Sequence, residues 1–341
     1  MKNRRLPYVV PIVIAAACTL APSPMRADTA YGFQTLNNPA DPTFNQLLGI
    51  NNGGTIAGYF GSGSATHPNK GYTLVPPATY TNENFPNSVQ TQVVGINSNA
   101  SPTTVGFWID GAGNNFGFVD QSNTFTSVSD PNVPGTAPVL TQLLGVNKNG
   151  IAAGFYLDGA GNAQGFLYNI ASNAFTPITL PAAFNAVMTT VTGVSDSGVV
   201  TGFYVDNAGN THGFIDNGGI FTSFDDPNAN GNTMFFGLNN LGMIVGSYAD
   251  INGLTNGLVY NMITNTWQTV DDPNASATPA FNVTGTTING INDKDQLVGF
   301  YSDGTNVDGM LATPVPEPAS LCLMAIGTTF AVLGRRRSLS S

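Results

Sequence analysis

Cysteine is almost absent from this chain of 341 residues. The two cysteines, Cys18 and Cys322, lie in the terminal segments, so the region between them has neither a disulfide nor a thiol nucleophile. The two histidines, His67 and His212, cannot make a typical zinc cluster without cysteine. A domain of this size can bury a sufficient core without disulfides.

Basic residues are also scarce, and most of them lie at the two ends of the chain. Seven of the ten basic residues are in the terminal segments, so residues 28–314 keep three lysines and no arginine. Of the 20 acids only Glu317 lies outside that region; 19 acids against three lysines leave a net charge of −16. Nucleic acid and anionic membranes are therefore poor partners, whereas polar sugars, cations or a basic partner fit this charge.

Several catalytic signatures are missing. No serine has the flanks of a Gly-x-Ser-x-Gly elbow, and there is no phosphate loop or dinucleotide fingerprint. A Ser-His-Asp triad is not excluded by composition. The only glutamates are Glu83 and Glu317, so a glycosidase pair within the domain would have to be built from aspartates.

What the sequence does contain is one phrase used six times. In its third copy the phrase runs from Gly145 to Tyr156, and successive copies are separated by 46, 50, 48, 44 and 53 residues. A period of that size indicates a repeat architecture. The copies begin at Gly49, Gly95, Gly145, Gly193, Gly237 and Gly290.

Each copy predicts a β-hairpin. Two glycines lie nine residues apart in five copies, as at Gly145 and Gly154, and we expect them to face each other across two crowded strands. The loop centre then falls on Asn149-Gly150, a dipeptide typical of type I′ turns. In the last copy the corresponding dipeptide is Lys294-Asp295, which predicts a different turn there.

Two further apolar runs follow each hairpin, so a repeat supplies four strands. This is the size of a β-propeller blade. The last copy stops after its third strand, at Leu311-Ala312, and a spare strand, 31–36, precedes the first copy. We therefore predict an all-β fold, a six-bladed propeller of four-stranded antiparallel blades closed by the N-terminal strand. An open β-solenoid is the alternative.

Residues 1–27 have the features of a secretory signal peptide. Lys2, Arg4 and Arg5 precede an apolar stretch from Leu6 to Leu20, and cleavage after Ala27 is expected. The alternatives are a transmembrane anchor and, because of Cys18, lipidation.

The C-terminal segment, 315–341, carries the most specific motif. A Pro-Glu-Pro triplet precedes an apolar stretch of 15 residues from Ala319 to Leu333 and then three arginines. A helix of that length spans roughly 22 Å, which is short for a bilayer but workable if the arginines snorkel on the cytoplasmic side. An ordinary C-terminal anchor is the alternative. The motif residues are Pro316, Glu317, Pro318, Arg335, Arg336 and Arg337.

This segment resembles the PEP-CTERM sorting tail of Gram-negative bacteria. The resemblance implies an exported protein held transiently in the inner membrane by a transmembrane helix, until an exosortase-type enzyme removes the tail. The protein then reaches the cell surface or the medium. The resemblance also implies an association with exopolysaccharide producers.

The repeats, from Gly49 to Leu311, are similar to the HAF repeat of secreted bacterial proteins. His212-Gly213-Phe214 comes nearest to that family's triplet. The similarity implies an exported repeat fold and supplies no catalytic residue.

Five aspartates occupy the same place in successive repeats and should form a ring on one face. Their hard oxygens are candidate calcium ligands, although each loop has only one carboxylate. The other interpretation is that each aspartate caps its own turn. No other cofactor is expected, and His212 is read as a strand-edge residue. The five are Asp110, Asp158, Asp206, Asp250 and Asp303.

The leading hypothesis is a non-enzymatic propeller that binds or structures extracellular polysaccharide or another surface component. The alternative is an extracellular glycan-acting enzyme using aspartates in the propeller mouth. An axial pocket with converging aspartates would favour the enzyme, and a Gly/Asn-lined face would favour binding.

Overall fold

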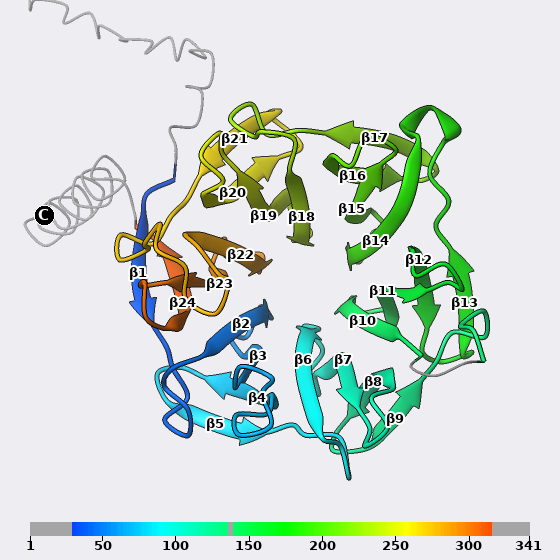
Figure 1. Cartoon of the computed structure of the whole chain (residues 1–341), viewed down its shortest axis with the longest axis horizontal. Helices are drawn as coiled ribbons and strands as arrows, with labels where there is room; N and C mark the ends of the chain where they lie inside the picture. The colour runs from blue at the N-terminus through cyan, green and yellow to red at the C-terminus, as the bar shows by residue number, and fades with distance from the viewer. Residues whose placement is uncertain (1–28, 136–138, 316–341) are drawn as a thin grey trace, which may run out of the picture.

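The computed structural model describes residues 29–135 and 139–315. The predicted signal peptide and the sorting tail beyond Val315 lie outside the described residues. In the described part, six four-stranded antiparallel sheets surround a central axis (Figure 1). The fold is thus the predicted six-bladed propeller, and no helix among the described residues is long and apolar enough to cross a membrane.

The six blades follow the six repeats, each running from an inner to an outer strand. Blade 1 is β2 (Asn45–Ile50), β3 (Ile56–Phe60), β4 (Lys70–Val75) and β5 (Thr79–Asn82). Blade 2 is β6 (Gln90–Ile96), β7 (Thr103–Ile109), β8 (Asn115–Gln121) and β9 (Phe125–Val128). Blade 3 is β10 (Thr141–Val146), β11 (Ile151–Leu157), β12 (Ala163–Asn169) and β13 (Ala174–Pro177). Blade 4 is β14 (Ala186–Val194), β15 (Val200–Asp206), β16 (Thr211–Asn217) and β17 (Ile220–Phe224), preceded by a 3-10 turn, η1 (Ala182–Phe184). Blade 5 is β18 (Thr233–Leu238), β19 (Met243–Ala249), β20 (Thr255–Asn261) and β21 (Thr266–Thr269). Blade 6 is β22 (Thr286–Ile291), β23 (Leu297–Ser302), β24 (Val307–Pro314) and β1 (Tyr31–Thr35).

The ring closes as the offset termini predicted. β1 pairs antiparallel with β24, from Tyr31 opposite Pro314 to Thr35 opposite Met310, and becomes the outer strand of blade 6 (Figure 1). Closure leaves the sixth blade with the same number of strands as the others, whereas an open solenoid would end on an incomplete unit.

The inner hairpins differ from the prediction in register. Gly154 lies opposite Leu143, and Gly145 lies opposite Ala153, because a β-bulge places Leu144 as an extra residue on the inner strand. The expectation that the two glycines face each other is therefore wrong. A Cβ at Gly154 would collide with the Gln142 carbonyl oxygen, and one at Gly145 would lie 2.6 Å from the Thr192 carbonyl oxygen of the next blade.

The hairpin turn of the third repeat is also one residue longer than a type I′ turn. Asn147 and Ile151 close a loop in which the Gly150 N–H donates to the Asn147 carbonyl at 3.3 Å, and Gly150 has φ +74°. This is a three-residue loop with one left-handed position rather than two. The last repeat makes the same turn with Asp295 at φ +56°, so the prediction of a different turn there is wrong.

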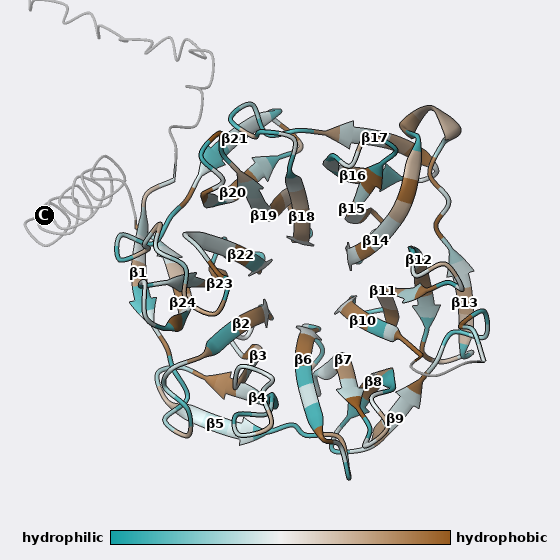
Figure 2. Ribbon diagram, viewed as in Figure 1, coloured by the Kyte–Doolittle hydropathy of each residue, from teal (hydrophilic) through white to brown (hydrophobic). Residues whose placement is uncertain are grey.

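The core lies between neighbouring blades. One cluster joins Val105 and Val119 of blade 2 to Leu143 and Phe166 of blade 3, and these four side chains are almost wholly buried. Figure 2 shows apolar residues mainly on the strands, while the connecting loops are mostly pale or hydrophilic. Burial of apolar area between sheets is the main stabilising contribution.

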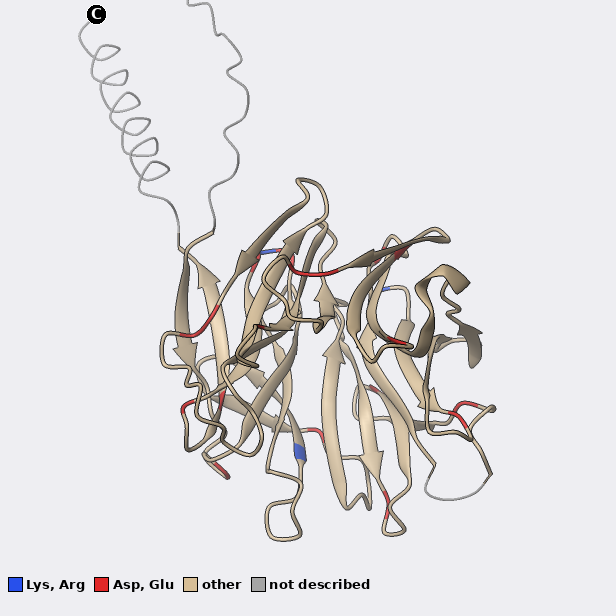
Figure 3. Cartoon of the chain, turned by 45° about the horizontal axis from the view of Figure 1, so that its top comes forward, with Lys and Arg blue, Asp and Glu red and all other residues tan. Residues whose placement is uncertain are grey.

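The molecule has two unlike faces. The turn face carries the hairpins between inner and second strands, and the loop face carries the connections between second and third strands and between blades. The Val315 N–H donates to the Ala30 carbonyl at 2.8 Å, so both ends of the described domain leave side by side at the turn face. Figure 3 shows acidic residues scattered over the loops and very few lysines.

Candidate ligand-binding site in the central channel

The bulge in each inner strand directs one side chain into the central channel. In blade 3 this residue is Leu144, and in blades 4, 5 and 6 it is Thr192, Phe236 and Asn289. Here the channel widens toward the loop face into a cavity of about 320 Å³, which we call the axial funnel. Its lining is Leu48, Gln92, Val94, Phe107, Gln142, Leu144, Phe155, Thr190, Thr192, Phe203, Phe236 and Asn289.

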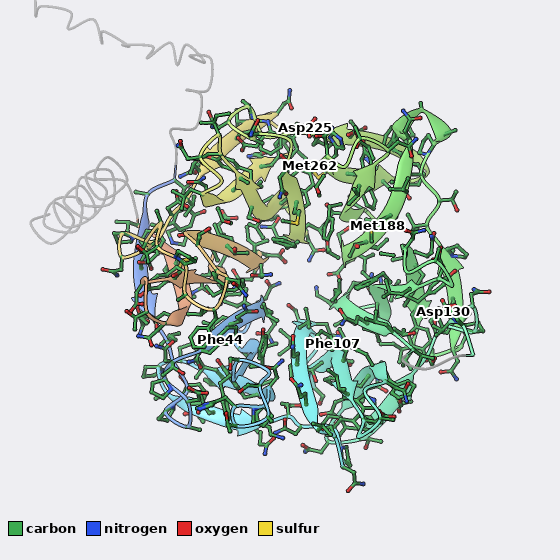
Figure 4. The ribbon with its side chains drawn as sticks, viewed as in Figure 1. Phe44, Phe107, Asp130, Met188, Asp225 and Met262 are labelled. Atoms are coloured by element: carbon green, nitrogen blue, oxygen red, sulfur yellow. The ribbon has the colours of Figure 1, made fainter. Side chains whose placement is uncertain are left out.

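Aromatic rings form one wall of the funnel. Phe107, Phe155 and Phe203 take the same position on the second strands of blades 2, 3 and 4, opposite Gln92, Gln142 and Thr190 on the inner strands. Phe203 also meets Phe236 edge-on, with ring centroids 6.1 Å apart. The funnel therefore presents aromatic rings beside amide and hydroxyl groups. Figure 4 labels Phe107 beside the channel.

The funnel is asymmetric, because the equivalent rings of blades 1 and 6 are packed into a separate cluster and do not line it. Tyr59 and Phe300, the equivalents on blades 1 and 6, pack in a cluster with Phe44 and Val307. The Tyr59 hydroxyl donates to Gln46 Oε1 at 2.7 Å. A ligand in the funnel would therefore meet the rings of blades 2–5.

None of the funnel's lining residues in the described chain is ionisable. General acid–base chemistry requires a titratable group within hydrogen-bond reach of the reacting atom. The converging aspartates that would favour an enzyme do not lie in this part of the channel.

Toward the turn face the channel narrows and is bordered by asparagines. A cavity of about 90 Å³ lies there. In five of the six hairpins an asparagine at the start of the loop bridges to the next blade. Asn147 Nδ2, for example, donates to the Ser195 carbonyl at 2.9 Å. We call this set the asparagine ring; its members are Asn51, Asn97, Asn147, Asn239 and Asn292, with Ser195 in the sixth position.

Carboxylates do occur at this narrow end, but they are engaged. Lys148 Nζ pairs with Asp196 Oδ2 at 3.1 Å. Asp293 accepts hydrogen bonds from the Asn240 N–H at 2.8 Å and from Asn52 Nδ2 at 2.6 Å. Burial alone would raise the pKa of Asp293, but the hydrogen bonds from Asn240 and Asn52 outweigh it and hold that pKa below its ordinary value. Such a group is a poor proton donor at neutral pH.

The five repeated aspartates lie in loops of the loop face and cap those loops. Asp158 Oδ1 accepts the N–H groups of Ala160 and Asn162, both at 2.9 Å, and these bonds lower its pKa, that from Asn162 most. In the part of the chain that the structure describes, no group of three His, Cys, Asp or Glu residues could hold a metal. Calcium at these loops stays a prediction. In the other four loops the aspartate Oδ1 likewise accepts the N–H of the residue two positions later; these aspartates are Asp110, Asp206, Asp250 and Asp303.

His212 lies near the start of β16, between two carboxylates. Its Nδ1 is 2.7 Å from Asp225 Oδ1, its Nε2 is 3.4 Å from Asp206 Oδ2, and its ring stacks on Tyr204. Because both ring nitrogens face carboxylates, His212 does not contact a serine as a triad requires. His67 similarly meets Asp41, at 2.9 Å.

Comparison with known proteins assigns the C-terminal segment. Residues 314–338 match the PEP-CTERM protein-sorting motif. The chain is thus an exported, surface-sorted protein with a β-propeller, and its motif is a signal for exosortase-type processing. No curated protein matches the chain. The HAF-like repeats, the transmembrane helix and the domain boundaries stay predictions.

Solved structures resemble the propeller itself. The SapL1 lectin in complex with alpha methyl fucoside has a TM-score of 0.52 at 13% identity, covering 80% of this chain and 92% of the lectin. The six-bladed Aleuria aurantia lectin has a TM-score of 0.51 at 9% identity, covering 84% and 99%. A Trypanosoma rangeli sialidase with the inhibitor DANA has a TM-score of 0.50 at 10% identity, covering 89% of this chain but 62% of the sialidase. At these identities the likeness shows the fold.

Proposed function

We propose that this exported propeller binds a neutral extracellular polysaccharide in the axial funnel without cleaving it. The observation that carries the proposal is the lining of the funnel. The rings of Phe107, Phe155 and Phe203 line the funnel and offer apolar surface for the C–H face of a sugar. Gln92 and Gln142 carry amides that donate to and accept from hydroxyls.

Charge supports a neutral ligand. The region from 28 to 314 has a net charge of −16, from three lysines and 19 acids, and repels anionic polymers. The funnel lining adds no cation to offset that repulsion. The lectins with the same fold were solved with fucosides, which adds support for a carbohydrate ligand.

A binding role is favoured over a hydrolytic one by where the carboxylates lie. Glycosidases flank the scissile bond with two carboxyl groups, one of them with a raised pKa. The carboxylates at the narrow end are Asp196, which is paired with a lysine, and Asp293, whose pKa is lowered.

The position of the chain ends supports binding at the surface of the cell. The sorting motif begins where β24 ends, on the turn face, whereas the funnel widens toward the loop face. A ligand therefore has access to the funnel from the side opposite to the tail.

The test is a glycan array probed with the purified full-length protein and read for both binding and cleavage. We expect binding to neutral glycans, weakened at least about tenfold by Phe155→Ala or Gln142→Ala, which corresponds to about 1.4 kcal/mol. Phe281→Ala is the matched control, because Phe281 is an exposed ring outside the funnel. Binding that survives both funnel variants, or release of sugar from the array, would refute the proposal.

A further inference from the structure

Away from the funnel, two acids from different blades meet in the interior. Glu83 follows β5, the outer strand of blade 1, and Asp120 lies in β8 of blade 2. Thr104 lies directly opposite Asp120 where β7 pairs with β8, and its hydroxyl is 3.5 Å from Glu83 Oε2, so the two carboxyl groups lie close together. The residues are only 9% and 5% exposed. We call them the interblade carboxylate pair.

The two threonine hydroxyls beside Glu83 make only long contacts with it. Thr73 Oγ1 is 3.4 Å from Glu83 Oε1, and Thr104 Oγ1 is 3.5 Å from Glu83 Oε2. Hydroxyl hydrogen bonds are usually 2.7–2.8 Å long, so both contacts are weak. Asp120 Oδ1 is buried and has no hydrogen-bond partner in the described chain. A buried acceptor without a donor is costly.

The pair also lacks a positive partner. In the described part of the chain, neither acid forms an ion pair with a lysine or a histidine. Two carboxylates in contact cannot both stay ionised unless a proton or a cation lies between them. Burial, and then the Asp120 carboxyl, raise the pKa of Glu83 to about 7. Near neutral pH Glu83 therefore holds its proton weakly.

A cation satisfies the observations better than a proton. A shared proton bridges only one pair of oxygen atoms. A cation is bound by several oxygens at once, and these can include Asp120 Oδ1, which has no hydrogen-bond partner in the described chain. The donors are carboxylate and hydroxyl oxygens, the set that calcium prefers, with no nitrogen or sulfur to favour zinc. The five loop aspartates differ, since each already accepts hydrogen bonds from its own loop.

We propose that Glu83 and Asp120 bind one calcium ion, which links blade 1 to blade 2. Water molecules and the hydroxyls of Thr73 and Thr104 would complete its coordination. The site is independent of the funnel and of the glycan that the funnel binds.

The test is thermal unfolding of the full-length protein at pH 7.5, with calcium chloride or with a chelator, together with a count of bound calcium by elemental mass spectrometry. We expect one ion per chain and a melting temperature raised by about 5 °C at a calcium concentration a hundred times Kd. Glu83→Gln and Asp120→Asn should each abolish both effects. Asp226→Asn is the matched control, because Asp226 is equally buried and its Oδ2 also has no partner, and it should keep the shift.

Two outcomes would overturn the site. The first is that calcium leaves the melting temperature unchanged, while Glu83→Gln raises the melting temperature at pH 8. That result would mean that the pair shares a proton and binds no calcium. The second is a calcium shift that persists in both Glu83→Gln and Asp120→Asn, which would place the ion elsewhere.

Discussion

Asn292 Nδ2 donates to the carbonyl oxygen of Asn51 at 3.0 Å, joining the last repeat to the first across 241 residues. The same bond links earlier neighbours, as between Asn147 and Ser195. The propeller is thus closed twice, by β1 at its rim and by the asparagine ring at its axis. Each ring asparagine also accepts N–H groups of its own turn, so one residue type holds both the hairpin and the next blade.

The ring has one gap, and filling it should stabilise the protein. Ser195 lacks the amide that would reach the Asn239 carbonyl, although its Oγ accepts the Val199 N–H at 3.0 Å. We expect Ser195→Asn to raise the free energy of unfolding by about 1 kcal/mol, the net value of one hydrogen bond. Urea denaturation measures the change. Ser195→Ala is the control and should be destabilising; a Ser195→Asn variant no more stable than wild type would contradict the role of the ring.

Both glycines of the third repeat are closely packed against backbone, and the second has the tighter contact. A Cβ at Gly154 would collide with the Gln142 carbonyl and lie 3.1 Å from Phe166 Cζ. Gly154→Ala should therefore cost more than about 2 kcal/mol, because the obstructing atom is backbone that cannot rotate away. Gly111→Ala is the control: nothing lies within 4 Å of its Cβ, and a change within about 0.5 kcal/mol is expected. Equal costs in denaturant titrations would refute this account.

The sequence predicted the number of blades and their closure, but not the register within the inner hairpins. The period of the repeats and the spare strand at 31–36 predicted the blades and their closure, because both follow from strand count. The register was mispredicted at Leu144, because a spacing of nine positions between the glycines fits a plain hairpin and a bulged one with a different loop equally well.

The site was harder to predict than the fold. Phe155 looks like any core residue of a strand, and only the packing of the blades shows that it lines the funnel whereas Tyr59, at the same repeat position, is covered by Phe44. Glu83 and Asp120 are 37 residues apart and share no motif. The asparagine ring did have a signal, the asparagine in the third place of the repeated phrase in five of the six copies, but no prediction was made from it.

The narrow end of the channel should be sensitive to acid. The pKa of Asp293 is held below its ordinary value of 3.8, so its carboxylate contributes stability above that value, and the contribution is lost as the pH falls through the lower folded-state pKa. We expect Asp293→Asn to be less stable than wild type by about 1 kcal/mol at pH 7, a modest figure because the group is partly solvated. The difference should shrink between pH 4 and pH 2. A difference that stays constant over that range, measured by urea denaturation, would show that the charge of Asp293 contributes nothing.

The last prediction concerns the sorting motif, which follows the propeller with almost no linker. Pro314 is still paired with Tyr31 in blade 6, and Glu317 comes three residues later in the sequence, between two prolines. Prolines on both sides predict an extended backbone, which a processing enzyme could bind. We expect protein recovered from the cell surface or medium of the native host to lack the segment from about Pro318 onward, as read by mass spectrometry of the C-terminal peptide. Replacing Pro316, Glu317 and Pro318 with alanines should leave the tail in place and the protein in the membrane fraction. An intact terminus at Ser341 on surface or secreted wild-type protein would mean that the segment serves as a plain anchor.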